Sequence, residues 1–269
     1  MKDTVIAIPT YNELETLPRQ VAKLRREVPQ ADLVIVDDNS PDGTGELAEE
    51  LASKDRGVQV VHRAEKAGLG PAYLEAFSWA YDAGYTWIVQ MDADGSHRVR
   101  DLKKLLARRL WPSEPDLVIG SRWIRGGRLQ GWSKLREALS RGGNAYIGAL
   151  LRLGIGDATA GFRVYRLDFL SRLGLENLDS RGYCFQIDMT RRAVKAGGNI
   201  VEVPITFQER AAGSSKMSSA IILEALAKVT RWGIADLLKL PAALRYRLVA
   251  LPNAHLRSAW VAVAKPRKY

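Results

Sequence analysis

Short apolar runs alternate with longer amphipathic segments through the first 120 residues of this 269-residue chain. The pattern predicts strands at residues 5–10, 33–37, 58–62, 87–91 and 117–120, with helices at 13–28, 45–54 and 70–83 between the first four. Strands that alternate with amphipathic helices pair in parallel through right-handed crossovers, so we predict an α/β fold with a mostly parallel central sheet flanked by helices. Ligands bind such sheets outside the carboxyl ends of the strands.

Beyond residue 120 the alternation is less regular. The pattern predicts helices at 133–153, 185–196 and 217–240, a short strand after residues 157–163, and a late strand at 199–207. We expect one catalytic domain over residues 1–240 and a basic tail over 241–269. The amphipathic segment 216–240 has few acidic residues, and both core packing and a position at a membrane interface stay open for it. No uncharged apolar run approaches the roughly twenty residues of a membrane span.

Two carboxylates, Asp92 and Asp94, follow the apolar run at 87–91, and Gly95 predicts a turn directly after them. Side chains at positions i and i+2 of a strand point the same way, so these carboxylates can share one hard cation or a metal-bound phosphate. Asp, Gly and Ser are also ordinary turn residues before a helix. The motif alone therefore leaves a metal site and a capped turn both open.

Polar residues also cluster where the first three strands end. Pro9-Thr-Tyr-Asn-Glu13 offers a ring and a carboxylate to a base and sugar, although a helix start also accounts for its Asn and Glu. Asp37 and Asp38 belong to a stretch with three carboxylates in six residues, which exceeds what a turn needs. The loop at 63–70 ends in two glycines before a helix, but it lacks the third glycine of a dinucleotide-binding loop. We therefore exclude a nicotinamide cofactor.

The formal charge of +10 is unevenly distributed. Residues 98–152 hold thirteen basic and four acidic residues, and residues 239–269 hold seven basic residues and no acidic one. Such blocks attract polyanions, including nucleic acid, anionic lipids and phosphorylated ligands. Arg136, Ser140 and Arg141 are spaced on one helix so that they could hold an anion, although a solvated basic face has the same pattern. Arg210 and Lys216 lie in a polar loop typical of those that close over phosphate.

Nucleic acid is not an expected partner. The carboxylates at the strand ends would repel a polyanion unless a cation intervened, and aromatic residues are not interleaved with the basic run as a single-strand binder requires. The single cysteine, Cys184, agrees with a reducing compartment and is interpreted as a small core residue. No secretory signal is recognised at the amino terminus, so we expect a cytoplasmic protein.

Six motifs taken together resemble the inverting glycosyltransferases of family 2, and within them the polyprenol (dolichol) phosphate mannose synthases. They are Pro9-Thr-Tyr-Asn-Glu13, Val36-Asp-Asp-Asn-Ser-Pro-Asp-Gly-Thr44, Asp92-Ala-Asp94, Gly120-Ser-Arg122, Gly161-Phe-Arg163 and Val203-Pro-Ile-Thr-Phe207. The resemblance runs from about residue 5 to 240. It implies a GT-A fold, the Rossmann-like fold of nucleotide-diphospho-sugar transferases, and an enzyme that uses GDP-mannose and Mg²⁺ or Mn²⁺ to make a polyprenyl phosphate mannose.

The resemblance also implies roles for individual residues. Those implied for the nucleotide sugar are Pro9, Tyr11, Glu13, Asp37, Asp38, Lys66 and Asp92, with Asp92 and Asp94 holding the metal and the diphosphate. Those implied for the acceptor phosphate are Arg122, Arg136, Ser140, Arg210 and Lys216, the last in a mobile loop. Asp94, Arg122, Arg136 and Arg210 are the residues expected to act in catalysis. Two positions depart from the family pattern, because Ser96 replaces a common Gln and Ser214 replaces a common Glu.

The implied chemistry agrees with the residues. A lipid phosphate is already ionised at neutral pH, so no general base is needed, and none of the three histidines is an obvious candidate. His97 follows the metal motif and is interpreted as a metal ligand or a support for one. In-line attack would give a β-linked mannose. We expect a protein bound peripherally to the cytoplasmic face of a membrane, through a surface helix or a membrane-anchoring partner protein. The alternatives are transfer of glucose from a UDP-sugar to the polyprenyl phosphate, and a non-catalytic polyanion-binding module.

Overall fold

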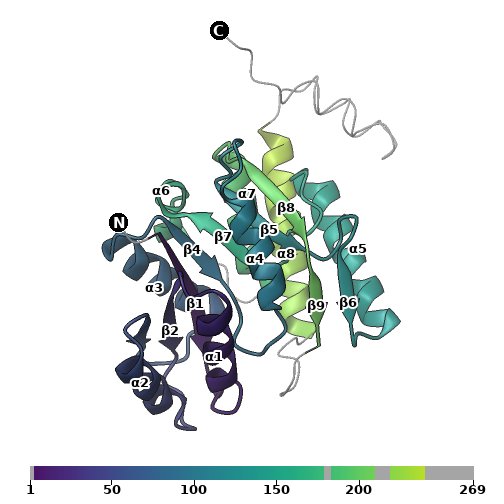
Figure 1. Cartoon of the computed structure of the whole chain (residues 1–269). Helices are drawn as coiled ribbons and strands as arrows, with labels where there is room; N and C mark the ends of the chain where they lie inside the picture. Colours follow the sequence, from purple (N-terminus) through teal and green to yellow (C-terminus); the bar gives the residue numbers. More distant parts are fainter. Residues whose placement is uncertain (1–2, 179–182, 210–218, 240–269) are drawn as a thin grey trace.

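The computed structural model of the chain describes residues 3–178, 183–209 and 219–239 (Figure 1). Its centre is a seven-stranded sheet in the order β3-β2-β1-β4-β7-β5-β8. The strands are β1 (Thr4–Thr10), β2 (Asp32–Asp37), β3 (Val58–His62), β4 (Trp87–Gln90), β5 (Leu117–Ser121), β7 (Arg163–Arg166) and β8 (Ile200–Pro204). Neighbouring strands pair in parallel except around β7, which runs antiparallel to both β4 and β5. The predicted mostly parallel α/β sheet is confirmed.

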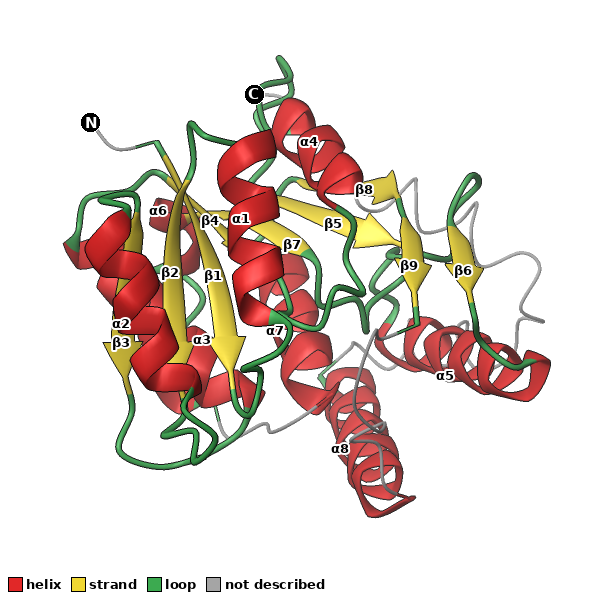
Figure 2. Cartoon of the chain, turned by 60° about the horizontal axis from the view of Figure 1, so that its bottom comes forward, coloured by secondary structure: helices red, strands yellow, loops and turns green. Residues whose placement is uncertain are grey.

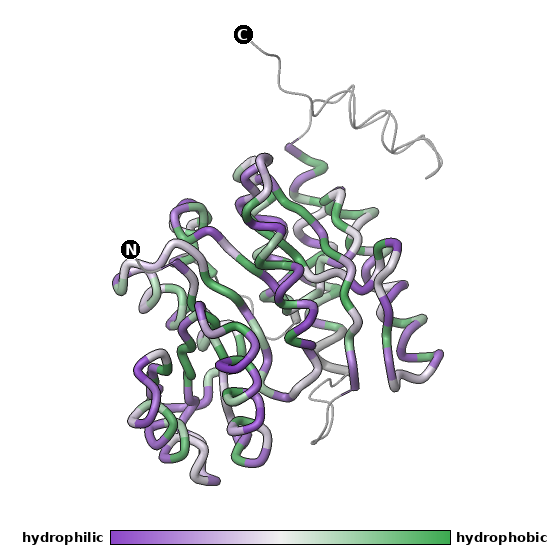
Figure 3. Tube along the Cα trace, in the orientation of Figure 1, coloured by the Kyte–Doolittle hydropathy of each residue, from purple (hydrophilic) through white to green (hydrophobic). Residues whose placement is uncertain are grey.

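Helices cover both faces of this sheet (Figure 2). The helices are α1 (Leu17–Glu27), α2 (Thr44–Lys54), α3 (Leu69–Asp82), α4 (Val99–Arg108), α5 (Lys134–Leu151), α6 (Leu167–Leu170), α7 (Tyr183–Lys195) and α8 (Ser219–Leu238). Apolar residues of α1, α2 and α4 form one core with one face of the sheet, and those of α3, α6 and α7 form a second core with the other face. The inner strands β1, β2, β4 and β5 are mostly hydrophobic and buried, whereas β7 has an arginine at each end (Figure 3).

Helices α5 and α8 pack together beside the main sheet. The Tyr146 hydroxyl of α5 lies 2.6 Å from the Thr230 hydroxyl of α8. Gly233 of α8 lies so close to Leu150 that a Cβ at this position would approach the Leu150 Cδ2 to 2.9 Å. The glycine therefore lets the two helices approach closely without displacing Leu150. A small apolar cluster that includes Ile147 and Val229 fills the space between this pair and α7.

The late strand predicted at 199–207 is wrong in one respect, because the chain there forms two strands in different sheets. After β8 the chain bends at Ile205, and β9 (Thr206–Gln208) pairs with β6 (Arg128–Gln130) in a separate two-stranded sheet. The buried carboxylate of Asp101, on α4, accepts a hydrogen bond from the Thr206 backbone N–H at 3.0 Å. This contact and the pairing with β6 both come from distant parts of the chain, so the strand pattern alone does not reveal the bend.

Two helix boundaries also differ from the prediction. The helix expected from residue 13 begins at Leu17, because Asn12 adopts a φ of 58° and the Glu13 backbone N–H donates to the Thr44 hydroxyl at 3.0 Å. The helix expected at 133–153 ends at Leu151, and Arg152 adopts a left-handed φ of 52°. At the start of the same helix Leu135 and Leu139 are exposed, at 71% and 65%.

Candidate active site

The carboxyl ends of β1 and β2 are joined through Asp37. Its carboxylate accepts hydrogen bonds from the Thr10 hydroxyl at 3.0 Å, from the Ser40 hydroxyl at 2.6 Å and from the Ser40 backbone N–H at 3.0 Å. The side chain is 2% exposed. Asp37 therefore orders the two loops in which the sequence places the residues for a nucleotide sugar.

The next residue, Asp38, faces the third loop. Arg63, directly after β3, donates to its carboxylate. Burial raises the pKa of Asp38 above its ordinary value, although the Arg63 charge opposes this shift. Nearby, the Lys66 ammonium lies 3.7 Å from the centre of the Tyr11 ring. The structure thus brings together predicted residues from the ends of β1, β2 and β3.

Asp92 and Asp94 occupy a tight turn after β4, which Gly95 closes with a φ of 76°. The Ser96 backbone N–H donates to Asp94 Oδ1 at 3.0 Å, and the Tyr73 hydroxyl donates to Asp92 Oδ1 at 3.3 Å. Burial, followed by the Asp92 charge, raises the pKa of Tyr73 well above its ordinary value, so this phenol stays a donor. Asp92 and Asp94 therefore belong to one polar site.

The two carboxylates at this turn suit a cation that a substrate also helps to bind. Within residues 3–178, 183–209 and 219–239 there is no group of three or more His, Cys, Asp or Glu side chains placed to hold a metal. Two carboxylates agree with a hard divalent cation, because Mg²⁺ is typically bound by one or two carboxylates together with substrate phosphates. The residues present therefore fit a metal whose shell a diphosphate completes.

His97 contacts this turn through a hydrogen bond and packs against two aromatic rings. Its Nδ1 accepts a hydrogen bond from the Asp92 backbone N–H at 3.3 Å, which occupies this nitrogen. The ring stacks on Phe162 at 4.6 Å between ring centres and meets the Phe207 ring edge-on at 5.5 Å. Of the two interpretations made from the sequence, these contacts favour support for Asp92.

Phe207 links the carboxylate turn to a group of arginines. Its ring lies 5.6 Å from the guanidinium carbon of Arg122 and meets the Trp132 ring edge-on at 5.6 Å. Trp132 in turn lies 3.9 Å from the guanidinium carbon of Arg136 and 5.8 Å from that of Arg122. The end of β5, the start of α5 and β9 therefore meet around one aromatic pair, in contact with the residues that support Asp92.

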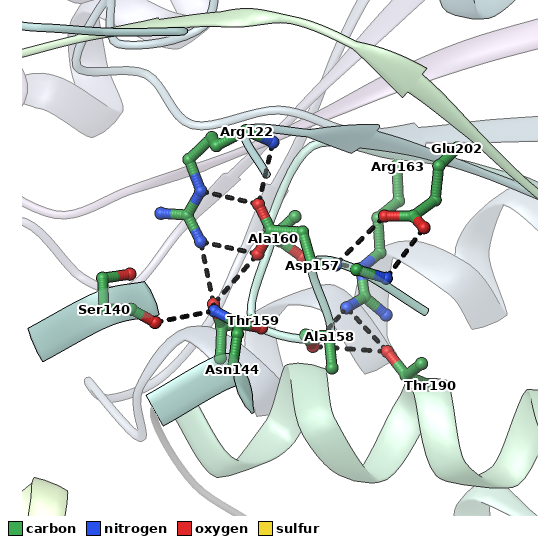
Figure 4. Close-up of polar contacts among 11 residues, drawn as sticks. Arg122, Ser140, Asn144, Asp157, Ala158, Thr159, Ala160, Arg163, Thr190 and Glu202 are labelled. Atoms are coloured by element: carbon green, nitrogen blue, oxygen red, sulfur yellow. Dashed lines mark hydrogen bonds and ion pairs between the residues drawn. The ribbon is translucent and has the colours of Figure 1, made fainter. Parts of the chain in front are cut away.

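A buried ion pair holds Arg122 (Figure 4). Asp157, which is fully buried, accepts bonds from Arg122 Nε and Nη2, both at 2.8 Å, and from the Arg122 backbone N–H at 3.0 Å. Burial alone would raise the pKa of Asp157, but the charge and hydrogen bonds of Arg122 lower it below its ordinary value. Asp157 therefore stays ionised, and its charge compensates that of Arg122.

The residues predicted on α5 have distinct surroundings. Arg136 is partly exposed, and its Nη1 donates to Glu209 Oε1 at 3.1 Å. Ser140 lies one helical turn further along, and its carbonyl accepts from Asn144 at 3.1 Å. Arg141 donates to Glu137 at 2.9 Å and lies 4.4 Å from the Trp123 ring. Trp123 and Trp132 therefore lie among the arginines in the folded chain, although the sequence does not interleave aromatic and basic residues. Arginine side chains cover the ring faces on which a nucleic-acid base would stack.

Two of the predicted residues, Arg210 and Lys216, lie outside the described residues, as does Ser214. Sequence reasoning gave no role to five residues that the structure places around these side chains, although the last of them ends one of the six motifs: Asn144, Asp157, Thr159, Trp132 and Phe207. The stretch Asp157-Ala-Thr did carry a signal, because a carboxylate and a hydroxyl two residues apart follow a basic helix. Nothing local in the sequence, however, pairs Asp157 with an arginine 35 residues earlier.

The mostly parallel sheet flanked by helices, with a carboxylate turn at the end of β4, agrees with the GT-A fold expected from the sequence motifs. The family model described as "Glycosyl transferase family 2" matches residues 5–174. The chain is 50% identical over 232 residues to "Polyprenol monophosphomannose synthase" of Mycolicibacterium smegmatis, a match that covers 86% of this chain and 87% of that protein. It is 49% identical over 228 residues to "Undecaprenyl-phosphate mannosyltransferase" of Micrococcus luteus, covering 85% and 93%. The chain belongs to glycosyl transferase family 2, as the sequence motifs predicted.

Solved structures share the fold at low sequence identity. Glucosyl-3-phosphoglycerate synthase from Mycobacterium tuberculosis, in complex with Mn²⁺, UDP and glucosyl-3-phosphoglycerate, superposes with a TM-score of 0.59 at 19% identity, covering 94% of this chain and 82% of that one. The mannosyltransferase PcManGT from Pyrobaculum calidifontis, in complex with GDP-Man and Mn²⁺, superposes with a TM-score of 0.53 at 16% identity, covering 98% and 81%. These structures support the GT-A fold.

Proposed function

We propose that this protein transfers mannose from GDP-mannose to a polyprenyl phosphate, with inversion at the anomeric carbon. The observation that carries the proposal is the contact path from the carboxylates after β4 to the arginines around Trp132, through His97 and Phe207. It brings a site suited to a metal-bound diphosphate beside a site suited to a second phosphate. Relatives at about half identity are named for transfer of mannose to lipid phosphates.

The acceptor side requires positioning more than proton transfer. A phosphate monoester is ionised at neutral pH, so its oxygen can attack without a general base. Arg136 and Ser140, one helical turn apart on α5, would bind this phosphate from one side, and Arg122 would approach it from the end of β5. Arg210 and Lys216 are proposed to complete the group. Arginines that hold two anions near one another reduce the cost of bringing the charges together.

The donor side uses the ends of the first four strands. Tyr11 and Lys66 would enclose the base, with Pro9, Glu13, Asp37 and Asp38 shaping the pocket around the nucleoside. Asp92 and Asp94 would hold Mg²⁺ or Mn²⁺, which supplies Lewis-acid stabilisation to the leaving diphosphate when it is bound. Two solved relatives in fold are described in complex with Mn²⁺ together with a nucleotide or nucleotide sugar, which supports a divalent metal here.

The test is sugar transfer by the purified full chain in detergent. Radiolabelled GDP-mannose and UDP-glucose are offered in parallel with a polyprenyl phosphate, with Mg²⁺, with Mn²⁺ or with EDTA. We expect labelled lipid from GDP-mannose only, lost in EDTA and restored by added metal. Labelling from UDP-glucose instead would overturn the donor assignment and keep the reaction class, and labelled lipid that persists in EDTA would overturn the metal assignment.

We also propose that the protein binds the cytoplasmic face of a membrane through α5 and α8. In the described part of the chain no helix is long and apolar enough to cross a membrane. The exposed apolar residues of α5 recur at helical spacing, and exposed Lys134 and Arg141 lie beside them. The exposed residues without a polar side chain on α5 are Leu135, Ala138, Leu139, Gly142, Ala145 and Ala149, and the exposed apolar residues of α8 include Leu223, Leu226, Ile234 and Leu238. Apolar residues with basic neighbours are typical of helices that lie on anionic membranes.

Replacing Leu135 and Leu139 together by serine should weaken binding to anionic lipid vesicles by at least about tenfold, because each leucine loses the free energy of apolar burial in the lipid. Vesicle co-sedimentation of the full chain measures the effect. The matched control is Leu110→Ser in the loop between α4 and β5, which removes an equally exposed leucine at 72%. Equal loss of binding in both variants would contradict a membrane surface on α5.

A further inference from the structure

The hydroxyl of Thr159 is fully used by three protein partners (Figure 4). It accepts a hydrogen bond from Arg122 Nη2 at 2.8 Å and from Asn144 Nδ2 at 3.0 Å, and it donates to Asp157 Oδ1 at 3.1 Å. A hydroxyl offers one donor and two acceptor sites, so these contacts exhaust its capacity. A single oxygen atom therefore contacts all three partners at once.

These partners come from separate parts of the fold. Arg122 follows β5, whereas Asn144 is on α5, one helical turn after Ser140, whose carbonyl it also binds at 3.1 Å. Arg136 lies a further turn back on the same helix. Thr159 is thus a direct polar link between the arginine after β5 and the helix that carries the other proposed acceptor residues.

The loop that carries Thr159 is held independently of its hydroxyl. Glu202 of β8 accepts from the Gly156 N–H at 2.8 Å and the Asp157 N–H at 3.0 Å. On the other side, the fully buried Arg163 donates to the carbonyls of Ala160 at 2.7 Å and Ala158 at 3.0 Å. Loss of the Thr159 hydroxyl therefore leaves the loop anchored at both ends, and it leaves Arg122 paired with Asp157.

We propose that Thr159 is a positioning residue for the acceptor phosphate. The Thr159 hydroxyl sets the separation between Arg122 and the α5 residues Arg136 and Ser140. The inference rests on the proposed function, because it takes these three residues as the acceptor site. A phosphate bound between β5 and α5 needs both groups within hydrogen-bond reach at once, and small displacements of positioned groups cost much of the binding gain.

The test uses the full chain with Thr159→Val, which keeps the shape and removes the hydroxyl. Binding of a short, water-soluble isoprenyl monophosphate is measured by calorimetry, and KM is measured separately for polyprenyl phosphate and for GDP-mannose. We expect Kd and KM for the isoprenyl phosphates to rise about tenfold, the effect of one hydrogen bond to a charged group, with the KM for GDP-mannose within about twofold of the parent. Thr159→Ser, which keeps the hydroxyl, should restore acceptor binding.

The matched control is Thr230→Val, which removes a hydroxyl that ties the same helix α5 to α8 through Tyr146. It should lower Tm without changing acceptor binding. Equal weakening in both variants would overturn the inference, because it would show that general anchoring of α5 is responsible. An unchanged Kd in Thr159→Val, or a parent chain that binds no isoprenyl phosphate, would overturn it as well. A parent that binds the phosphate but transfers no mannose would refute the proposed function alone, and the Kd comparison would still decide the role of Thr159.

Discussion

Asp94→Asn should reduce kcat for mannose transfer by about 1,000-fold while the protein stays folded. The substitution keeps the size of the side chain and an oxygen that can accept a hydrogen bond from the Ser96 backbone N–H. In the parent protein this N–H donates to Asp94 Oδ1 at 3.0 Å. It removes the negative charge proposed to hold the divalent cation at the leaving diphosphate. Stabilising the charge that develops on a leaving group contributes strongly to catalysis, so a loss of this size follows from removing one ligand.

Two measurements separate this effect from misfolding. The Tm of the variant alone should match that of the parent, whereas the increase in Tm that Mn²⁺ with GDP gives the parent should be much smaller in Asp94→Asn. Asp82→Asn removes an exposed carboxylate at the end of α3 and should leave both activity and this increase unchanged. Near-parental activity of Asp94→Asn would contradict the metal assignment at this residue.

The sequence predicted the strands and helices of the first half of the chain because the spacing of apolar residues differs between a buried strand and an amphipathic helix. The strand-and-helix alternation before residue 120 placed β1 to β5 and α1 to α3 within a few residues, since buried strands and amphipathic helices have distinct periods. The carboxyl ends of parallel strands lie at one edge of a sheet, and this predicted where a ligand binds. The family resemblance assigned Tyr11 and Lys66 to one ligand, and the structure brings the two side chains into contact.

The contacts that the sequence did not predict depend on tertiary packing, and most of them are long-range. Asp157 pairs with Arg122 and Glu202 holds the Asp157 backbone, and no periodicity marks either contact. His97 stands directly after the carboxylate motif, yet its ring binds backward to the Asp92 N–H and stacks on Phe162. In each case tertiary packing decides what a polar residue does, and residue type alone leaves several roles open.

Arg122 and Arg136, which the family resemblance assigns to the acceptor phosphate, differ in their surroundings. Arg122 is 8% exposed and is compensated by the fully buried Asp157, whereas Arg136 is 32% exposed and meets Glu209, which is 52% exposed. An exposed pair such as Arg136 with Glu209 contributes roughly 0.2–1 kcal/mol, less than the roughly 1.5–3 kcal/mol of a hydrogen bond to a charged group. An incoming phosphate can therefore displace Glu209 from Arg136 at little cost, while Asp157 stays with Arg122.

Arg136→Ala should raise the KM for polyprenyl phosphate by about 30- to 100-fold and leave the KM for GDP-mannose within about twofold, because the lost contact is a charge-assisted bond to the acceptor alone. Initial-rate measurements with each substrate varied in turn give the two values.

Arg141→Ala is the matched control, since it removes the same charge from the same helix at a side chain engaged by Glu137 and Trp123. Equal increases in both KM values for Arg136→Ala would indicate that it supports the fold of the site, and an equal acceptor effect in Arg141→Ala would indicate that α5 attracts the phosphate by its overall charge. A selective effect at Arg136 would mean that the acceptor phosphate binds where Trp132 brings Arg136 close to Arg122, next to the carboxylate turn proposed to hold the metal and the donor diphosphate.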